Sequence, residues 1–393
     1  MRLWLYSSWT SRTAELRIFV SKGDLEMEKK QLSLYFHVPF CVSKCAYCSF
    51  YSSPRFSDEL RNSYAEALCR HVKSFPCPED YTVKTVYFGG GTPPLVGVDN
   101  LIKILNAAKG IFCFESGVEI TLEVNPLTVD LSDLKALNSA GFNRLSMGLQ
   151  SANPSSLKRL CRAHGTDDFV RCFTDAGTAG FDNINVDIIF ALPNEKLAEL
   201  ENTLRFVTDF KPNHISAYSL SLEEGTPLYS RRGEYRFPTE DEEEEQYKVI
   251  CEFLREKGYA HYEISNFALD GFESKHNCVY WKRGEYVGFG ASAHSFFEGK
   301  SFSILPDAER YISLVDEGFY APTDFESASF IGSAEAEEER IMLGLRLSEG
   351  IEFNRPIPKQ IFDGGYAELK NGRLRLTEKG FRVSNTLISL LTE

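Results

Sequence analysis

The chain has 393 residues, 43% of them hydrophobic and 25% charged, and its formal net charge is −13. This composition is ordinary for a globular protein and leaves room for two or three domains, or for one barrel with an appendage. The acidic balance argues against nucleic acid and anionic membrane as partners, and no apolar run is long enough for an integral membrane span.

The first 28 residues are predicted to be an extension outside the fold. Between Met1 and Lys22 there are four basic residues and one acidic residue, Glu15, which is the composition of a mitochondrial transit peptide. The alternative is that translation starts at Met27, directly before the first strand-like run. We expect a cytoplasmic protein, or a mitochondrial one if the segment is a genuine transit peptide.

Apolar strand-like runs then alternate with stretches of helical period. This alternation predicts βαβ units around a parallel sheet, and six such units indicate an α/β fold with an open, partial (β/α)6 barrel. The expected strands cover 33–40, 84–88, 118–124, 144–149, 183–192 and 214–222, and the expected helices cover 58–74, 99–111, 132–140, 154–160, 167–178 and 195–208.

Three cysteines, Cys41, Cys45 and Cys48, follow the first strand with the spacing C-x3-C-x2-C. Three thiolates this close can hold three irons of a cubane cluster. The next cysteine is Cys69, so one iron would stay open to bind a substrate molecule. A zinc site would need a fourth ligand at a suitable spacing, and His37 lies within the strand. Disulfides are disfavoured because the other seven cysteines are scattered singly through apolar stretches.

Polar residues recur where the predicted strands end. The glycine run 89–91 follows the second strand, Glu123 ends the third, Gln150 follows the fourth and Asp187 lies within the fifth. The active site of a (β/α) barrel is built at this face, from the ends of several strands. A charge inside a buried strand is costly unless it is paired or bound, so Asp187 either forms an internal salt bridge with an arginine or binds a ligand.

The pattern changes after residue 238. A long helix is expected over 239–257, followed by a polar and aromatic stretch, a linker to about residue 332, and a tail of helix, hairpin and helix. Asn371-Gly372 predicts the hairpin turn, and the tail is interpreted as an α+β, winged-helix-like unit. The predicted domains are an extension over 1–28, the barrel core over 29–238, a helical and aromatic-loop extension over 239–332, and a C-terminal domain over 333–393.

From about residue 33 to the C-terminus the chain resembles the radical S-adenosylmethionine (SAM) superfamily. Within it the resemblance is to the branch that contains the oxygen-independent coproporphyrinogen III dehydrogenases (HemN) and the HemW heme chaperones. The usual GLP after the fifth strand is here ALP at 191–193, a departure that concerns the substrate loop and not the cofactor site. The matching strings are HVPFC at 37–41, GGGTP at 89–93, RLSMGLQS at 144–151, YEISNFA at 262–268, HNCVYW at 276–281 and GFGASAHS at 288–295.

The resemblance implies a [4Fe–4S] cluster on Cys41, Cys45 and Cys48 whose open iron binds SAM. Carboxylates and amides accept hydrogen bonds from ribose hydroxyls, and an arginine can bind the SAM carboxylate bidentately. The implied SAM-binding residues are Tyr35, Tyr47, Gly91, Thr92, Glu123, Gln150, Arg162 and Asp187.

Two features favour the chaperone group over the dehydrogenases. Phe50 stands where the dehydrogenases carry a further cysteine, and residues 276–281 match the heme-associated signature of the chaperones. Imidazole is a common heme ligand and aromatic rings pack on porphyrins, so His276 and Trp281 are candidate heme-binding residues, with Cys278 as a second candidate ligand. The alternative for His276 is a structural role, in which its ring hydrogen bonds anchor an aromatic loop.

The expected function is therefore a heme chaperone that binds heme, a [4Fe–4S] cluster and SAM, and passes heme to acceptor proteins. On this interpretation the radical scaffold has no coproporphyrinogen oxidase activity. The alternative is an enzyme, an oxygen-independent coproporphyrinogen III oxidase that decarboxylates its substrate through a 5′-deoxyadenosyl radical.

Overall fold

The computed structural model describes residues 29–54, 56–318, 327–330 and 333–392. The predicted N-terminal extension over 1–28 lies outside the described residues. Among the residues described, none of the helices has both the length and the apolar character needed to cross a membrane.

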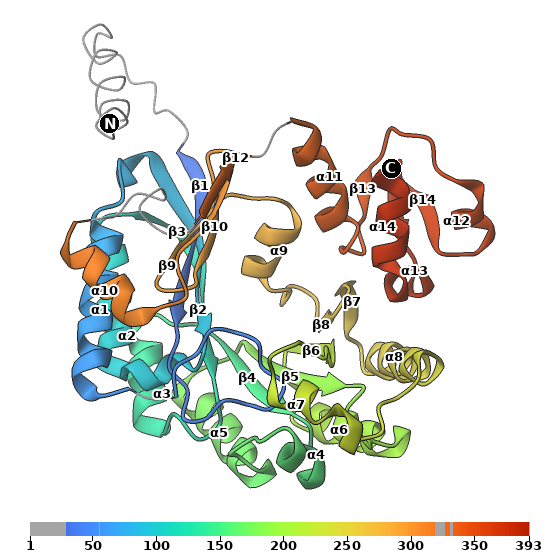
Figure 1. Cartoon of the computed structure of the whole chain (residues 1–393), viewed down its shortest axis with the longest axis horizontal. Coiled ribbons are helices and arrows are strands. Elements are labelled where there is room, and N and C mark those ends of the chain that lie inside the picture. The colour runs from blue at the N-terminus through green and yellow to red at the C-terminus, as the bar shows by residue number, and fades with distance from the viewer. Residues whose placement is uncertain (1–28, 55, 319–326, 331–332, 393) are drawn as a thin grey trace, which may run out of the picture.

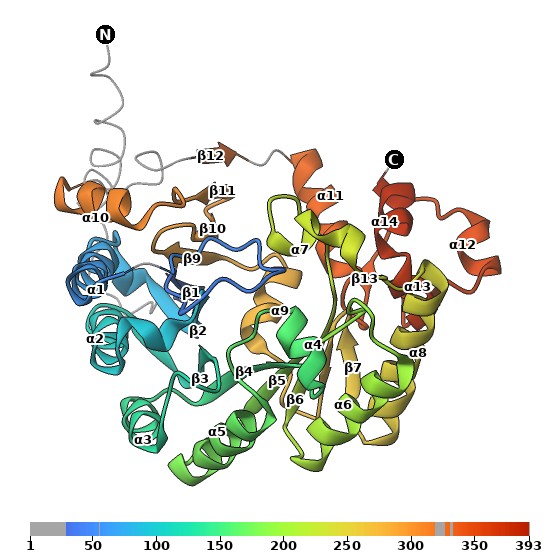
Figure 2. The same cartoon turned by 60° about the horizontal axis from the view of Figure 1, so that its bottom comes forward.

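A twelve-stranded sheet curves into an open barrel and forms the body of the molecule (Figures 1 and 2). Its central strands are the ones that the sequence predicts, and they run parallel in chain order. The predicted partial (β/α) barrel is therefore confirmed. These strands are β1 Lys30–Val38, β2 Tyr81–Gly90, β3 Cys113–Val124, β4 Arg144–Gln150, β5 Ile184–Phe190 and β6 His214–Ser219.

Helices cover the convex face of this sheet (Figure 2). Alternate residues of a strand point to opposite faces, and the outward set is apolar, as Leu34, Phe36 and Val38 of β1 illustrate by being fully buried in the main hydrophobic core. The helices between successive strands are α1 Asp58–Lys73, α2 Val98–Lys109, α3 Leu131–Ala140, α4 Pro154–Arg159, α5 Thr166–Ala179 and α6 Leu197–Asp209.

The concave interior of the barrel, here called the lumen, is lined by polar side chains. This differs from the layers of bulky apolar residues that usually fill a closed (β/α) barrel. These residues occupy the strand positions that alternate with the outward apolar ones. The buried polar residues of the six central strands include Ser33, His37, Thr85, Glu119, Thr121, Arg144, Ser146, Asn185, His214 and Ser216.

The chain after β6 extends the sheet at both edges, so the linker predicted up to residue 332 is wrong for the residues of that segment that the structure describes. β8 pairs antiparallel with β6, β9 lies parallel to β1, and further antiparallel strands continue beyond each. None of these strands exceeds four residues, too short for a period-two pattern to stand out. The elements are α7 Pro227–Ser230, α8 Glu240–Glu256, β7 Ala260–Glu263, β8 Asn266–Ala268, β9 Tyr286–Phe289, β10 His294–Phe297, β11 Lys300–Ser303, α10 Ala308–Asp316 and β12 Ser327–Phe330.

Helix α9, Lys275–Trp281, connects β8 to β9 and so runs between the two ends of the parallel sheet. Figures 1 and 2 show it on the concave side. The carboxylate of Glu119 on β3 accepts hydrogen bonds from the backbone N–H groups of Lys275 (3.2 Å) and His276 (3.0 Å). A carboxylate at a helix N-terminus satisfies orphan donors and offsets the helix dipole. The lumen therefore anchors α9.

The C-terminal residues form a small α+β unit with a three-stranded sheet in the order β13-β15-β14. Asn371 and Gly372 both have positive φ (53° and 76°), as a two-residue hairpin turn requires, which confirms the predicted hairpin. Strands from 239–332 belong to the same sheet as the barrel, so the sheet does not mark a boundary between these two predicted domains. The predicted domain boundaries therefore stay predictions. The unit consists of α11 Ser333–Gly344, β13 Ile351–Glu352, α12 Lys359–Asp363, β14 Ala367–Lys370, β15 Arg373–Leu376, α13 Glu378–Arg382 and α14 Ser384–Thr392.

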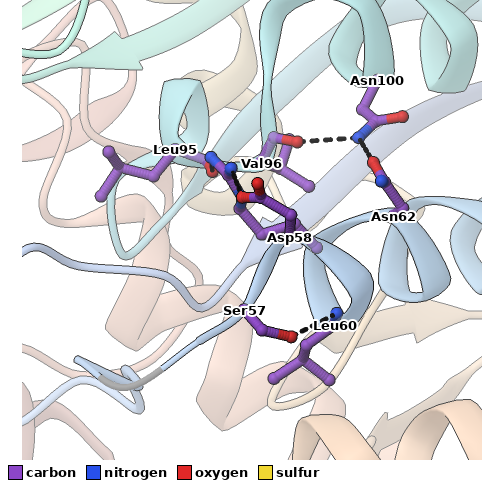
Figure 3. Close-up of polar contacts among 8 residues, drawn as sticks. Ser57, Asp58, Leu60, Asn62, Leu95, Val96 and Asn100 are labelled. Carbon is purple, nitrogen blue, oxygen red and sulfur yellow. Dashed lines mark hydrogen bonds and ion pairs between the residues drawn. The ribbon is translucent and has the colours of Figure 1, made fainter.

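Polar contacts hold the start of helix α1, which follows the cysteine loop in the chain (Figure 3). The Ser57 hydroxyl accepts a hydrogen bond from the N–H of Leu60 (3.2 Å) and caps the helix. Asn100 of α2 donates to the side chain of Asn62 (2.9 Å) and to the carbonyl of Val96 (2.8 Å). The bond between Asn100 and Asn62 ties α1 to the segment that follows the glycine run.

Candidate functional site

The three cysteines lie on the loop between β1 and α1, at the carboxyl end of the barrel strands. Backbone hydrogen bonds hold this loop: the N–H of Cys41 donates to the carbonyl of Ser53 (3.2 Å), and that of Ala46 donates to the carbonyl of Leu160 (3.0 Å). The N–H of Leu228 in α7 donates to the carbonyl of Ala46 (2.8 Å). Segments that follow β4 and β6 therefore fix the cysteine loop.

Cys41, Cys45 and Cys48 are partly buried free thiols. Cys41 Sγ lies 3.7 Å from Thr92 Oγ1, and Arg162 Nη1 donates to Cys45 Sγ at 3.4 Å. Burial raises the pKa of the Cys41 and Cys48 thiols, so binding of iron must displace their protons. In the described part of the chain no three His, Cys, Asp or Glu side chains converge on one ion position.

The glycine run at the end of β2 packs directly against the cysteine loop. The N–H of Gly91 donates to the carbonyl of Val38 (2.9 Å), and that of Thr92 donates to the carbonyl of Phe40 (2.7 Å). A Cβ atom on Gly91 would lie 2.7 Å from the Phe40 carbonyl oxygen, so a larger residue would force the two segments apart. This contact brings two predicted SAM-binding residues beside the first cysteine.

A pocket of about 110 Å³ opens beside the cysteine loop, where β2 to β5 end. Two polar atoms on its lining residues, Asn125 Oδ1 and Arg162 Nε, are buried without a hydrogen-bond partner among the described residues. Such atoms are costly unless a ligand or water pairs with them, so the pocket fits a polar ligand such as SAM. The predicted SAM-binding residues that line it are Gly91, Thr92, Glu123, Gln150, Arg162 and Asp187.

The other two predicted SAM-binding residues, Tyr35 and Tyr47, do not line this pocket. The ring of Tyr35 stacks on that of Tyr87 with centroids 6.2 Å apart, and the Tyr35 hydroxyl lies 3.2 Å from His37 Nδ1. Tyr47 packs against a small apolar cluster that includes Leu160. Tyr47 nevertheless lies close enough to Arg162 and Asp187 of the pocket for their charges to act on its hydroxyl, so the assignment of both tyrosines to SAM stays a prediction.

Glu123, at the end of β3, is one of the charged residues that line the pocket. It accepts hydrogen bonds from the Tyr87 hydroxyl (2.8 Å) and the Gly90 N–H (3.2 Å). Burial, only partly offset by the Tyr87 hydrogen bond, raises the pKa of Glu123 to about 7. The carboxylate therefore changes its charge near neutral pH.

Asp187 does not form the internal salt bridge that the sequence left open, so that alternative is wrong. Its carboxylate accepts hydrogen bonds from Asn185 Nδ2 (2.8 Å) and Ser146 Oγ (3.1 Å), and within the described ranges it makes no ion pair. Burial raises the pKa of Asp187 despite these bonds. The carboxylate is held in place by neutral donors and stays available to a ligand.

Sequence reasoning missed the supporting residues of this site, such as Ser146, Asn185 and Tyr87. A signal was present: in β3 and β5 polar and apolar residues alternate, as in Glu-Ile-Thr-Leu-Glu at 119–123 and Asn-Val-Asp at 185–187. Alternation with period two marks a strand whose two faces meet different surroundings. This alternation identifies which residues of β3 and β5 face the lumen before any contact is known.

The two heme candidates, His276 and Trp281, do not lie side by side. His276 is fully buried, with Nδ1 2.7 Å from Thr85 Oγ1 and Nε2 2.7 Å from the Tyr280 hydroxyl. Residues five apart on an α-helix point in directions about 140° apart. The Trp281 ring faces Arg346, whose guanidinium lies 5.5 Å from the ring centroid. The rings of Tyr87 and Tyr280 each lie with their centroids 5.0 Å from that of His276, and a role of Trp281 in heme binding stays a prediction.

Comparison with known proteins agrees with this geometry. Residues 35–207 match the radical SAM superfamily. The chain is 33% identical to the heme chaperone HemW of Lactococcus lactis over 380 residues, 92% of this chain and 97% of that protein. It is 32% identical to the heme chaperone HemW of Bacillus subtilis, over 82% of this chain and 85% of that protein. The solved structure of coproporphyrinogen III oxidase (HemN) from Escherichia coli superposes with a TM-score of 0.79 over 93% of this chain and 90% of that one, at 20% identity, which shows a shared fold.

A partial parallel barrel with a C-x3-C-x2-C loop beside a polar pocket at its carboxyl end defines a radical SAM protein. That superfamily implies a [4Fe–4S] cluster and SAM, and the thiols and pocket present here fit both. The identity to the Lactococcus protein covers 92% of this chain and so extends through the barrel into the C-terminal unit. The chain belongs to the HemW family.

The pH dependence of SAM binding should report the ionisation of Glu123. An ionised carboxylate accepts ribose hydroxyls better than a neutral acid does, so affinity should rise as pH increases through about 7, where the raised pKa of Glu123 lies. Glu123→Gln should remove this component of the profile and weaken binding about tenfold, which corresponds to about 1.4 kcal/mol. Calorimetric titrations at a series of pH values measure the SAM affinity of the wild type and of the variant.

Two variants should move the pH midpoint of this rise in SAM affinity in opposite directions. Tyr87→Phe removes the hydrogen bond that lowers the pKa of Glu123 and should shift the midpoint up, whereas Asp187→Asn removes a charge that raises this pKa and should shift it down. If Glu123→Gln keeps the wild-type profile, Glu123 does not contact the ligand.

Proposed function

We propose that this protein is a heme chaperone that binds heme and a SAM-coordinating [4Fe–4S] cluster and transfers heme to acceptor proteins. The observation that carries the proposal is the identity to relatives named as heme chaperones, which covers 97% of the Lactococcus lactis protein. Sequence identity confined to the barrel would support a radical SAM fold but not the chaperone function. We also propose a cytoplasmic location, supported by the ten free cysteines of the described residues.

In this proposal Cys41, Cys45 and Cys48 hold the cluster, and the adjoining pocket binds SAM. The cluster and SAM supply one-electron chemistry when bound. Arg162 lies between the two sites, because it donates to Cys45 Sγ and, through Nη2, to the Gly148 carbonyl (2.9 Å), while its Nε has no partner among the described residues. That Nε suits the carboxylate of SAM, and the oxygens of Glu123, Gln150 and Asp187 suit the ribose hydroxyls.

We assign His276 as the residue that would bind heme iron. The Thr85 hydroxyl donates to Ser33 Oγ (2.7 Å), so its oxygen accepts the Nδ1–H of His276. The Nε2 lone pair then accepts the Tyr280 hydroxyl hydrogen. Metal-ligating histidines are held in the same way, through their other ring N–H. Burial and the charge of Arg144 lower the pKa of His276 to about 3, so the ring is neutral, and heme iron would replace the Tyr280 hydroxyl at Nε2.

The second candidate function is oxygen-independent oxidation of coproporphyrinogen III, which the HemN-like fold favours. The cysteine loop argues against it. Phe50 occupies the position at which the dehydrogenases carry a further cysteine, and its side chain is 67% exposed beside the cluster ligands. We therefore rank this enzyme activity second.

Heme titration tests the proposed function. The purified protein should develop a Soret band that saturates at about one heme per chain, since one ligand set binds one iron. The same preparation, with reconstituted cluster, reductant and SAM, should leave coproporphyrinogen III unchanged. Absence of saturable heme binding would overturn the chaperone proposal, and formation of the decarboxylated product at a useful rate would favour the enzyme.

A further inference from the structure

Most polar groups of the lumen satisfy one another through hydrogen bonds. Asn185 donates to Ser146 Oγ (2.7 Å) and Asp187 Oδ1 (2.8 Å), and its own oxygen lies 2.6 Å from His214 Nδ1. His214 Nε2 in turn lies 2.8 Å from the Tyr262 hydroxyl. Buried polar networks are stable when every member has a partner. A member without a partner therefore stands out.

Arg144 and Thr121 are such members, and they lie opposite each other in the pairing of β3 with β4. Arg144 is 2% exposed, its Nε is unpartnered, and its guanidinium makes no ion pair or hydrogen bond with any other described residue. Thr121 is completely buried, and its Oγ1 also has no partner. A buried guanidinium without an acceptor is costly, so two neighbouring orphan groups mark a place where a ligand supplies the missing acceptor.

These groups lie directly beneath the SAM pocket. The next lumen-facing pair toward the carboxyl end, Glu123 and Ser146, lines that pocket, and two residues along a strand span roughly 7 Å. The charge of Arg144 also reaches His276, because it contributes to lowering the pKa of that ring. Arg144 thus lies one lumen-facing pair below the SAM pocket and close enough to the histidine assigned to heme iron for its charge to act on that ring.

The chemistry of the two side chains selects a carboxylate. The Nε and one Nη of arginine form a planar fork that matches the two oxygens of a carboxylate, and a threonine hydroxyl can donate to a remaining lone pair. The nearby acids do not meet this need, because Glu123 and Asp187 are bonded to other donors. Burial raises the pKa of both acids by more than the charge of Arg144 lowers it, which reduces the negative charge they offer to Arg144.

We propose that Arg144 and Thr121 form a carboxylate-binding subsite in the lumen that receives a propionate group of heme. This inference rests on the proposed heme-chaperone function and adds to it a second point of attachment besides the iron. It explains why an arginine is buried at the start of β4 facing a threonine, and it predicts that the propionates, and not the iron alone, decide which porphyrins are accepted.

The test compares hemin with hemin dimethyl ester, in which both propionates are neutral. Cluster-reconstituted protein is titrated with each in the same mild detergent, and the Soret change gives the two dissociation constants. Wild type should bind hemin at least about tenfold more tightly than the diester, the effect of losing about 1.4 kcal/mol of charged hydrogen bonding. With a net charge of −13, general electrostatic attraction would favour the diester, so a preference for hemin reports a specific contact.

Arg144→Lys and Thr121→Val are the matched variants. Lysine keeps the charge but lacks the planar fork of donors, and valine keeps the shape but lacks the hydroxyl. Each variant should reduce the ratio between the dissociation constants of the diester and of hemin. Unchanged SAM affinity and iron content check that the fold is intact. Equal binding of both hemins by wild type, or an undiminished preference in both variants, would overturn the subsite while leaving heme binding itself in place. Failure of wild type to bind either hemin would overturn the chaperone function and the subsite with it.

Discussion

Cys45→Ala is expected to abolish cluster assembly. Wild-type protein reconstituted without oxygen should bind about four irons per chain, with a spectrum that changes when SAM is added, because one iron lacks a protein ligand. Loss of one of three thiolates leaves two irons without a protein ligand, so the variant should retain essentially no cluster. Iron analysis and low-temperature electron paramagnetic resonance of the reduced protein measure the effect.

Cys77→Ala is the matched control for this experiment. Cys77 is exposed and precedes the start of β2, at the opposite end of the barrel strands from the cysteine loop. This variant should keep the full iron content and the SAM-dependent change. A cluster of normal iron content and spectrum in Cys45→Ala would contradict the assignment of the three ligands.

His276→Ala is expected to weaken heme binding by at least about tenfold, or about 1.4 kcal/mol, and to shift the Soret band, since the iron loses its axial imidazole. Tyr280→Phe is predicted to do the reverse. The Tyr280 hydroxyl occupies His276 Nε2 in the heme-free protein, and a hydrogen bond of this kind contributes about 0.5–1.5 kcal/mol. Its removal should therefore tighten heme binding roughly two- to tenfold, which spectral titration resolves.

Trp281→Ala serves as the control on the same helix. Its ring faces Arg346 and not the His276 side of α9, so its removal should leave the position of the Soret band unchanged. If Tyr280→Phe weakens heme binding and His276→Ala leaves the spectrum intact, then His276 is a structural anchor of α9. The heme ligand would then lie elsewhere in the chain.

The cysteine spacing illustrates what a sequence can state directly. Cys41, Cys45 and Cys48 lie within one short loop, so their proximity follows from chain connectivity alone. The proximity of residues at the strand ends can also be predicted from the sequence, because the carboxyl ends of parallel strands meet at one edge of the sheet. For this reason Glu123, Gln150 and Asp187 could be assigned to one pocket without coordinates, and the structure places all three there.

The sequence by itself thus determined the barrel class, the cluster loop and most of the pocket, because each depends on local periodicity or on position along a strand. Only the tertiary structure decided what depends on contacts between distant segments. It showed that His276 bonds Thr85, 191 residues away, and not Trp281, and that Arg144 lies buried opposite Thr121 without an acceptor. The partners of a buried polar group are set by strand register and by the path of α9 across the lumen, and neither is encoded in a local pattern.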